Sequence, residues 1–192
     1  MAFRDLMSPG AGSSPTQAPG RRAPDAAIRI RPVLPSDLEL ERRFVYGLSA
    51  RSRYLRLLSG RQLQPGELER WTHIDPGREI GLVALVGVGR DEEEVGFAQG
   101  VVEDAAEGRW DFAIVIADAW QGRGLGRMLL GKLVEAARNV GAATLSGITL
   151  AENHAMVMLA RKLGFSVRRE DGDATLLRLE LRLRTDALTS AS

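Results

Sequence analysis

The sequence predicts a single α/β domain of the mixed α+β type, with a central, mostly antiparallel sheet of about seven strands flanked by about four helices. Strand-like runs joined by short turns occupy the middle of the chain. Two amphipathic helix patterns follow, with one further strand pattern between them, and an alternating apolar pattern typical of a hairpin closes the chain. With 192 residues, 44% apolar and 27% charged, the chain has room for one core rather than two.

The domain is predicted to span residues 28–184. Residues 1–27 are rich in Pro, Gly, Ser and Ala and offer little that could be buried, so they predict a disordered tail. Residues 185–192 are expected to form a short disordered C-terminal tail.

The elements can be placed in chain order. A strand is expected at residues 28–31, and Ser-Asp-Leu-Glu at residues 36–39 fits a capping box that opens a helix to about residue 47. Ser49 is a candidate cap for a second helix. The remaining expected elements are a short helix at 65–72, strands at 80–88, 95–103 and 110–117, a helix at about 124–139, a strand at 144–150, a helix at 153–163 and closing strands at 165–169 and 175–183.

Composition excludes several classes of function. The net charge of +1 creates no field that would recruit nucleic acid or an anionic membrane, so neither is expected as a partner. The absence of cysteine excludes disulfides, thiolate metal sites and a cysteine nucleophile. His73 and His154 lie far apart, so no metal site is expected. No apolar run approaches the ~20 residues that span a bilayer, and no secretory leader is evident. A cytoplasmic location is therefore expected.

The most informative segment is the glycine-rich stretch at residues 120–127, between a strand pattern and an amphipathic helix. Its alternating glycines remove side chains where backbone amides must approach a ligand closely. The helix that follows adds unpaired N–H groups and the positive end of its dipole, an arrangement suited to a pyrophosphate. Arg123 and Arg127 could add positive charge at the rim.

Other phosphate motifs fit this chain poorly. A P-loop requires Gly-Lys followed by Ser or Thr, whereas Lys132 is followed by Leu133 inside the helix pattern. A dinucleotide fingerprint requires a glycine where Arg127 stands and an acidic residue in the region of residues 142–150, which has none. The remaining alternative is a tight strand-to-helix turn that holds no ligand.

The turn resembles the signature Gln/Arg-x-x-Gly-x-Gly/Ala of the GNAT (Gcn5-related N-acetyltransferase) superfamily, with Gln121, Gly124 and Gly126 at its fixed positions. A second stretch is also similar to that family, because Asn153 opens a helix pattern that ends in Lys-Leu-Gly-Phe at residues 162–165. The resemblance covers roughly residues 28–183. It implies the GNAT fold, acetyl-CoA as cosubstrate and no metal.

The resemblance also implies which residues bind acetyl-CoA. In the family, amides of the turn hold the pyrophosphate, the preceding strand pairs with the pantetheine arm, and the residue at Asn153 hydrogen-bonds that arm. Asn153 can serve as an ordinary helix N-cap at the same time. The expected cofactor-binding residues are Ile114, Val115, Ile116, Gln121, Gly122, Arg123, Gly124, Leu125, Gly126, Arg127 and Asn153.

Acetyl transfer requires a base, since an amine of pKa near ~10.4 is mostly protonated at neutral pH. Asp111, which should share a strand face with Ala113 and Val115, matches the strand glutamate that is the base in Gcn5-like and bacterial protein acetyltransferases. Its side chain is one methylene shorter, which favours relay through water. The alternative is a solvated or salt-bridged strand acid. Glu103 is the fallback base, with a surface charge as its alternative.

The position of the tyrosine that protonates the departing thiolate in many family members is Ala160 here. That substitution leaves the general acid unassigned. Water could suffice, because an unperturbed thiol has a pKa near ~8.5.

The N-terminal part of the predicted domain carries a resemblance that bears on the acceptor. Residues 48–56 and 74–79, and Arg31-Pro32 followed by Asp37, resemble the acetyltransferase domain of bacterial Pat-like protein-lysine acetyltransferases. This implies direct attack by a protein lysine in a ternary complex. A small amine (an amino acid, polyamine or antibiotic) and a non-catalytic acyl-CoA-binding module are the alternatives. Both a monomer and a homodimer remain open. Four arginines could face a CoA phosphate or an acidic target, or simply solvent: Arg51, Arg53, Arg56 and Arg61.

Overall fold

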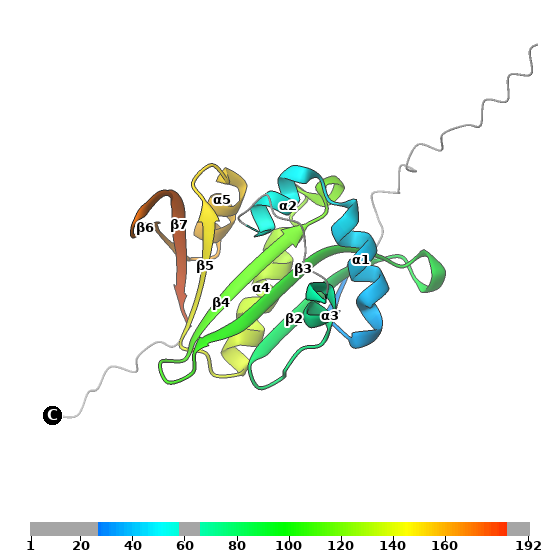
Figure 1. Ribbon diagram of the computed structural model, residues 1–192, viewed down its shortest axis with the longest axis horizontal. Coiled ribbons are helices and arrows are strands. Elements are labelled where there is room, and N and C mark those ends of the chain that lie inside the picture. The colour runs from blue at the N-terminus through cyan, green and yellow to red at the C-terminus, as the bar shows by residue number, and fades with distance from the viewer. Residues whose placement is uncertain (1–26, 58–65, 184–192) are drawn as a thin grey trace, which may run out of the picture.

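The computed structural model describes residues 27–57 and 66–183 (Figure 1). The predicted tails lie outside the described residues, except for Ala27. Residue 184, the last of the predicted domain, and Arg61 also lie outside them. Within the described part, no helix is both long and apolar enough to cross a membrane.

A seven-stranded sheet forms the centre of the domain, in the order β1-β2-β3-β4-β5-β7-β6. Strands β4 and β5 are parallel, and the other neighbouring strands are antiparallel, which confirms the predicted mixed, mostly antiparallel sheet. The strands are β1 (Arg29–Pro32), β2 (Glu79–Val86), β3 (Glu93–Asp104), β4 (Arg109–Ile116), β5 (Thr144–Leu150), β6 (Ser166–Glu170) and β7 (Asp173–Arg182).

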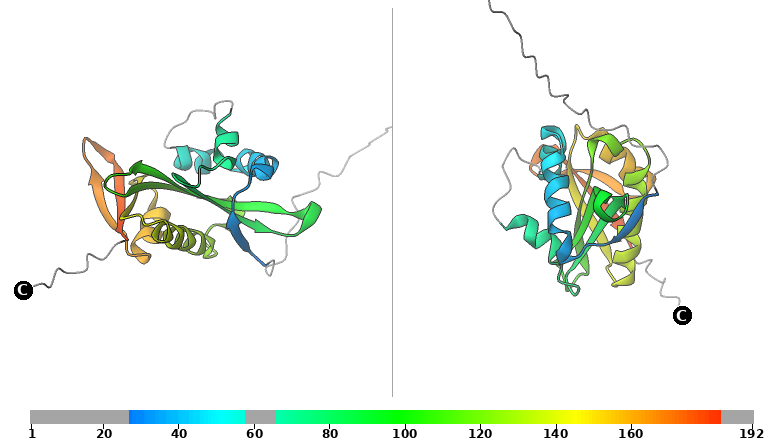
Figure 2. Two further views of the ribbon diagram at one scale, coloured as in Figure 1. Left: turned by 90° about the horizontal axis from the view of Figure 1, so that it is seen from below. Right: turned by 90° about the vertical axis from the view of Figure 1, so that its right-hand side faces the viewer.

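Helices cover both faces of the sheet (Figure 2). One face carries α1 (Leu38–Gly47), α2 (Ala50–Leu57) and α3 (Glu67–Thr72); the other carries α4 (Leu125–Asn139) and α5 (His154–Lys162). The described residues thus form five α-helices, close to the approximate number of four expected, and each lies where the sequence placed a helix.

Each face of the sheet has its own apolar core. The amphipathic pattern that predicted α4 is confirmed for Leu125, Leu129 and Leu133, which are fully buried against the sheet, whereas Val140 at its end is exposed. Burying one such side chain stabilises the fold by roughly 1.5–3 kcal/mol. On the opposite face, Phe44 of α1 and Trp71 of α3 pack around Phe97, whose ring lies 6.1 Å from that of Trp71.

The capping box predicted at Ser36 is wrong. A 3₁₀ turn, Pro35–Asp37, precedes α1, and its Asp37 is buried rather than exposed. The Asp37 carboxylate accepts from Arg31 at 2.6 and 2.7 Å and from the Leu34 amide at 2.8 Å, so the ion pair with β1 decides how the helix begins. The cap predicted at Ser49 is confirmed, because its Oγ accepts from the Ser52 amide at 3.2 Å.

Two glutamates share the interior between α1 and β3. Glu41 is 0% and Glu94 2% exposed, and the charge of one affects the titration of the other. Among the described residues, none of their four carboxyl oxygens has a hydrogen-bond partner. Two neighbouring carboxylates buried without partners repel each other, so at least one of them is expected to carry a proton. Loss of water raises the pKa of both groups, and the charge of Glu41 raises that of Glu94 further.

This pair predicts a dependence of stability on pH. The pKa values of Glu41 and Glu94 in the folded protein both lie above the ordinary value of 4.5. The stabilisation that comes from holding these groups protonated is therefore complete below pH 4.5 and is lost as the pH rises towards the folded-state pKa values. Each proton can contribute up to about 1.4 kcal/mol per pH unit to this loss. Glu94→Gln, whose side chain is uncharged at every pH, is expected to flatten the decline in the free energy of unfolding measured by urea titration. Glu39→Gln, at an exposed site on α1, is the control, and an unchanged slope in Glu94→Gln would contradict the assignment.

Candidate active site

Strands β4 and β5 are paired over only a short stretch. Their parallel register joins Arg109 to Thr144, Trp110 to Leu145 and Asp111 to Ser146, and beyond Asp111 the two strands separate (Figure 1). The β5-facing edge of residues 112–116 therefore has no strand partner. Such an edge presents backbone donors and acceptors that an extended ligand can pair with.

Close packing marks the place where the strands separate. A Cβ on Gly147 of β5 would lie 2.8 Å from Cε1 and 2.9 Å from the carbonyl oxygen of Phe112. The Phe112 ring in turn lies 5.3 Å from that of Phe165, inside the larger core. Only glycine allows the β5 backbone to approach Phe112 this closely.

The predicted phosphate-binding turn lies at the start of α4. Gly122 and Gly124 have φ of 73° and 87°, values that side chains other than glycine rarely adopt, and nothing lies within 4 Å of where their Cβ atoms would be. The backbone amide of Gln121 donates to the Asp118 carbonyl, and that of Arg127 donates to the Gly124 carbonyl. The backbone amides of residues 122–126, in contrast, make no hydrogen bond within the described residues. A row of free amides at a helix N-terminus fits an anion such as a pyrophosphate.

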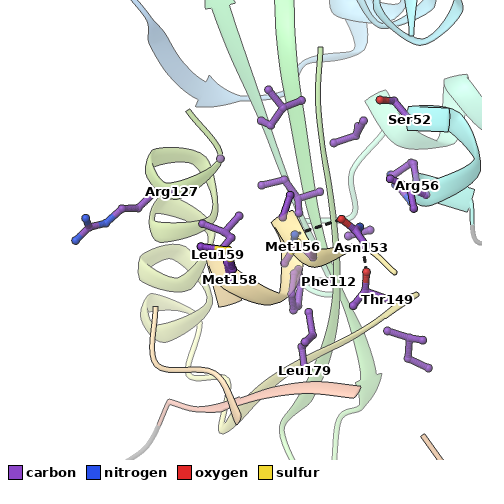
Figure 3. A pocket seen from close by; sticks show the side chains of 18 of the residues that line it. Ser52, Arg56, Phe112, Arg127, Thr149, Asn153, Met156, Met158, Leu159 and Leu179 are labelled. Atoms are coloured by element: carbon purple, nitrogen blue, oxygen red, sulfur yellow. Dashed lines mark hydrogen bonds between the residues drawn. The ribbon is translucent and has the colours of Figure 1, made fainter. Parts of the chain in front are cut away.

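One cavity of about 1030 Å³ joins the free strand edge to this turn. Figure 3 shows it between α2, with Ser52 and Arg56 on one side, and α4 and α5 on the other. The sequence-predicted residues that line it are Glu103, Asp111, Ile114, Val115, Ile116, Gln121, Gly122, Gly124, Gly126, Arg127 and Asn153.

Two predicted residues do not line the cavity. The Leu125 side chain is fully buried in the core, and the Arg123 guanidinium lies 5.5 Å from the centre of the Trp120 ring. Only their backbone amides belong to the turn. Arg127 lines the cavity, but its side chain points away from the other labelled residues (Figure 3).

Asp111 lies at the last paired position of β4, where the strands begin to separate. Its side chain is on the sheet face of Val115, as predicted, while Phe112 belongs to the opposite core. Although water reaches this side chain, the protein around it removes part of its hydration. This desolvation, reinforced by the nearby Glu103 carboxylate, raises the pKa of Asp111 to about 6. Asp111 is thus mostly ionised at neutral pH but titrates close to it.

Charged groups of both signs surround Asp111. Glu103 lies on the adjacent strand, two residues beyond Val101, the register partner of Asp111. It also forms a 3.9 Å ion pair with Arg109. Arg178 of β7 lies on the other side, where its guanidinium binds Glu170 at 2.7 and 2.8 Å. A cation that enters this end of the cavity meets two carboxylates.

The comparisons with known proteins agree with this geometry. The sequence model of the acetyltransferase (GNAT) family matches residues 49–165, which include the fork between β4 and β5, the turn and α5. The chain belongs to the GNAT family. Acetyltransferase PA5475 of Pseudomonas aeruginosa is 34% identical over 149 residues, 77% of this chain and 80% of that protein.

Acetyltransferase Pat of Mycolicibacterium smegmatis is 30% identical over 142 residues, which cover 74% of this chain but 42% of that protein. The GNAT domain of S. lividans PAT superimposes with a TM-score of 0.73 and 25% identity over 81% of this chain and 90% of that one. YncA of Salmonella typhimurium, solved with its cofactor acetyl-CoA, has a TM-score of 0.67 and 21% identity over 87% of this chain and 100% of that chain, which shows the shared fold. The predicted GNAT fold is confirmed, and the chain is an acetyltransferase.

Asn153 occupies the GNAT position at the start of α5 (Figure 3). Its Oδ1 accepts from the Met156 amide at 3.2 Å and its Nδ2 donates to Thr149 Oγ1 at 3.1 Å. The expected N-cap is therefore confirmed. One Nδ2 hydrogen and one Oδ1 lone pair are left over to meet a ligand.

The other candidate groups lie away from the cavity. His73 ends α3, where its Nδ1 contacts the Glu69 carbonyl at 2.8 Å, and His154 is exposed on α5. Ala160, at the GNAT tyrosine position, is fully buried in the core, and neither described tyrosine lines the cavity. No group of three or more His, Asp or Glu side chains in the described part could hold a metal.

Sequence reasoning did not assign part of the cavity wall. Residues 48–56 and Lys162 belong to stretches that resemble the family, but Ser52, Leu55 and Lys162 were not predicted to bind the cofactor, and the side chains from β5 and β7 carry no local motif. The unassigned wall residues include Ser52, Leu55, Thr149, Met156, Leu159, Lys162 and Arg178.

The contact at the fork gives a stability prediction. Gly147→Ala places a methyl group against Phe112 and is expected to destabilise the fold by about 1–3 kcal/mol, the usual range for overpacking. Gly131→Ala is the matched control, because its Cβ meets nothing within 4 Å in the interior of α4, where alanine should stabilise by roughly 0.5–1 kcal/mol. Thermal unfolding of both variants measures the difference; equal melting temperatures would show that the fork tolerates a side chain.

Proposed function

We propose that this protein transfers the acetyl group of acetyl-CoA to a lysine side chain of a protein, by direct attack in a ternary complex. The observation that carries the proposal is the position of Asp111, a carboxylate that titrates near neutral pH at the point where β4 leaves β5. The free strand edge and the unpaired amides of the turn open into the same cavity. Donor, acceptor and base can therefore meet there.

The residues present fit acetyl-CoA. The amides of residues 122–126 would hold its pyrophosphate, and the edge of β4 at Ile114, Val115 and Ile116 would pair with the pantetheine arm. Asn153 would add a hydrogen bond to that arm through its remaining donor or acceptor. When bound, acetyl-CoA supplies a thioester carbonyl for the amine to attack.

The proposed role of Asp111 is to take a proton from the acceptor ammonium. With a pKa raised to about 6, it is mostly ionised at pH 7 and a stronger base than an ordinary aspartate. Its short side chain favours transfer through one water. Glu103 is the second carboxylate in reach and is proposed to attract the ammonium and to act as the fallback base.

No tyrosine from the described residues reaches the cavity, so water is proposed to protonate the departing thiolate. A thiolate is a far better leaving group than an alkoxide, because an unperturbed thiol has a pKa near ~8.5. A dedicated acid is therefore less necessary than a base.

Two observations favour a protein as the acceptor. The relatives include Pat of Mycolicibacterium smegmatis and the GNAT domain of S. lividans PAT. In addition, the sheet face beside Asp111 carries ion pairs rather than an apolar pocket, with Arg178 bound to Glu170 and Arg168 to Glu180 at 3.3 Å. A polar face of this kind suits the hydrated surface of a folded protein.

The base assignment predicts the pH dependence of the rate. Because Asp111 must be ionised to accept a proton, kcat/KM of the wild type should fall as pH drops below about 6. Asp111→Asn should lower kcat by roughly 10²–10⁴-fold and remove this fall, whereas Asp111→Glu should keep most of the rate. Asp104→Asn, in the β3–β4 turn, is the control. An Asp111→Asn enzyme with normal rates at neutral and high pH would rule this base out.

The acceptor assignment is tested by a direct comparison. Purified enzyme and acetyl-CoA are incubated with folded lysine-bearing proteins, with free amino acids, polyamines and aminoglycosides, or with no acceptor, and CoA release is followed together with acetyl-lysine by mass spectrometry. Stoichiometric acetyl-lysine on a protein is the expected result. Turnover with free amines alone would favour a small-molecule enzyme, and CoA binding without any turnover would favour a non-catalytic module.

A further inference from the structure

Helix α2 forms one wall of the cavity, yet apolar packing does little to hold it. Of its residues Ala50–Leu57, only Ser52 is buried, whereas the preceding helix buries Phe44 and Val45. Leu55 and Arg56 of α2 nevertheless line the cavity. The Arg56 guanidinium lies 4.8 Å from the centre of the Trp71 ring of α3 and helps to hold the helix. The position of this wall depends otherwise on what fixes Ser52 and the start of the helix.

Asp118, in the segment between β4 and α4, provides that anchor. One carboxylate oxygen accepts from the Ser49 amide at 2.9 Å; the other accepts from the hydroxyls of Ser49 at 2.7 Å and Ser52 at 2.8 Å. Partial burial acts to raise the pKa of Asp118, but these hydrogen bonds outweigh it and lower the pKa. Asp118 is thus a stable anion at the N-terminal end of α2, where the helix dipole also favours it.

The same network reaches the phosphate-binding turn. Gln121 donates from Nε2 to the Ser52 hydroxyl at 3.1 Å and to the Ile116 carbonyl at 3.0 Å. A chain of hydrogen bonds therefore runs from the side-chain amide of Gln121 through the Ser52 hydroxyl to the Asp118 carboxylate. It ties the end of β4, the first residue of the turn and the wall of the cavity into one unit.

A carboxylate is an unexpected neighbour for a turn suited to an anion, because like charges repel. Asp118 does not line the cavity, and its oxygens are directed to donors on α2 instead. Its charge is therefore used within the protein and not against a ligand. This separates Asp118 from the groups that would contact substrate.

We propose that Asp118 is a positioning residue, which fixes α2 to the 121–126 turn and so sets the distance between the acceptor wall and the cofactor-binding amides. The proposal rests on the proposed binding of acetyl-CoA at that turn. It assigns a role to the acidic residue ahead of the turn and to the serines at the start of α2, acting together.

The first test is Asp118→Ala, with Asp173→Ala as the matched control. Asp173 also accepts from an amide and a hydroxyl, both of Thr175, but at the start of β7. Asp118→Ala should raise the Kd for CoA, measured by calorimetry, and the KM for the acceptor by about tenfold or more, as expected when hydrogen bonds to a charged group are lost. Asp173→Ala should change melting temperature without changing either constant.

Two serine variants make the test independent of whether Asp118→Ala folds. Ser52→Ala breaks the link to Gln121 and should raise the Kd for CoA, whereas Ser49→Ala removes the α2 cap but leaves the Gln121–Ser52–Asp118 chain and should raise mainly the acceptor KM. If Ser52→Ala and Asp118→Ala lower only the melting temperature and leave Kd and KM at wild-type values, the positioning role is wrong.

The wild-type titration separates this proposal from the proposed function. No CoA binding by folded wild-type protein would overturn both. A second outcome would overturn the positioning role alone. In it, the wild type binds CoA, Gly124→Val weakens this binding, and Asp118→Ala and Ser52→Ala leave the Kd for CoA and the KM for the acceptor unchanged. Binding of acetyl-CoA at the turn would then stand.

Discussion

The early separation of β4 from β5 is the constraint on which the rest of this structure depends. A strand inside a sheet normally satisfies its backbone groups on both edges, and groups left unpaired in the interior are unfavourable. Here the edge of residues 112–116 avoids that penalty because it borders a cavity and not the core. The turn at the end of β4, the start of α4 and the position of Asp111 all follow from where the pairing stops.

Most of the fold could be predicted because its signals are local. Alternating apolar residues gave the strands, and the stripe of Leu125, Leu129 and Leu133 gave α4. The turn at residues 121–126 could be predicted for a similar reason, since amide donors at a helix start need no distant partner. Asp111 was identified from its place in a strand pattern, but its raised pKa depends on desolvation by the surrounding protein and on the charge of Glu103, which only the folded chain supplies.

The features that could not be predicted are pairings between distant segments. The Glu41–Glu94 pair joins a helix to a strand, and nothing in either segment marks its acid as buried. Asp118 accepts hydrogen bonds from Ser49 and Ser52, which lie 69 and 66 residues earlier in the chain. The capping box at Ser36 failed for a related reason, because an ion pair between two elements, Asp37 with Arg31 of β1 six residues earlier, outweighed a plausible local pattern. Long-range polar contacts in this protein decide details that local propensity cannot.

The packing of Phe112 has a consequence for how this protein can diverge. Its ring is part of the main core, packs closely against Gly147 and lies 5.3 Å from the Phe165 ring, so the point where the strands separate belongs to that core. A substitution there is expected to lower stability as well as to change the cavity. The exposed side chains of α2, β6 and β7 are under no such constraint, so sequence change is expected to accumulate there more readily.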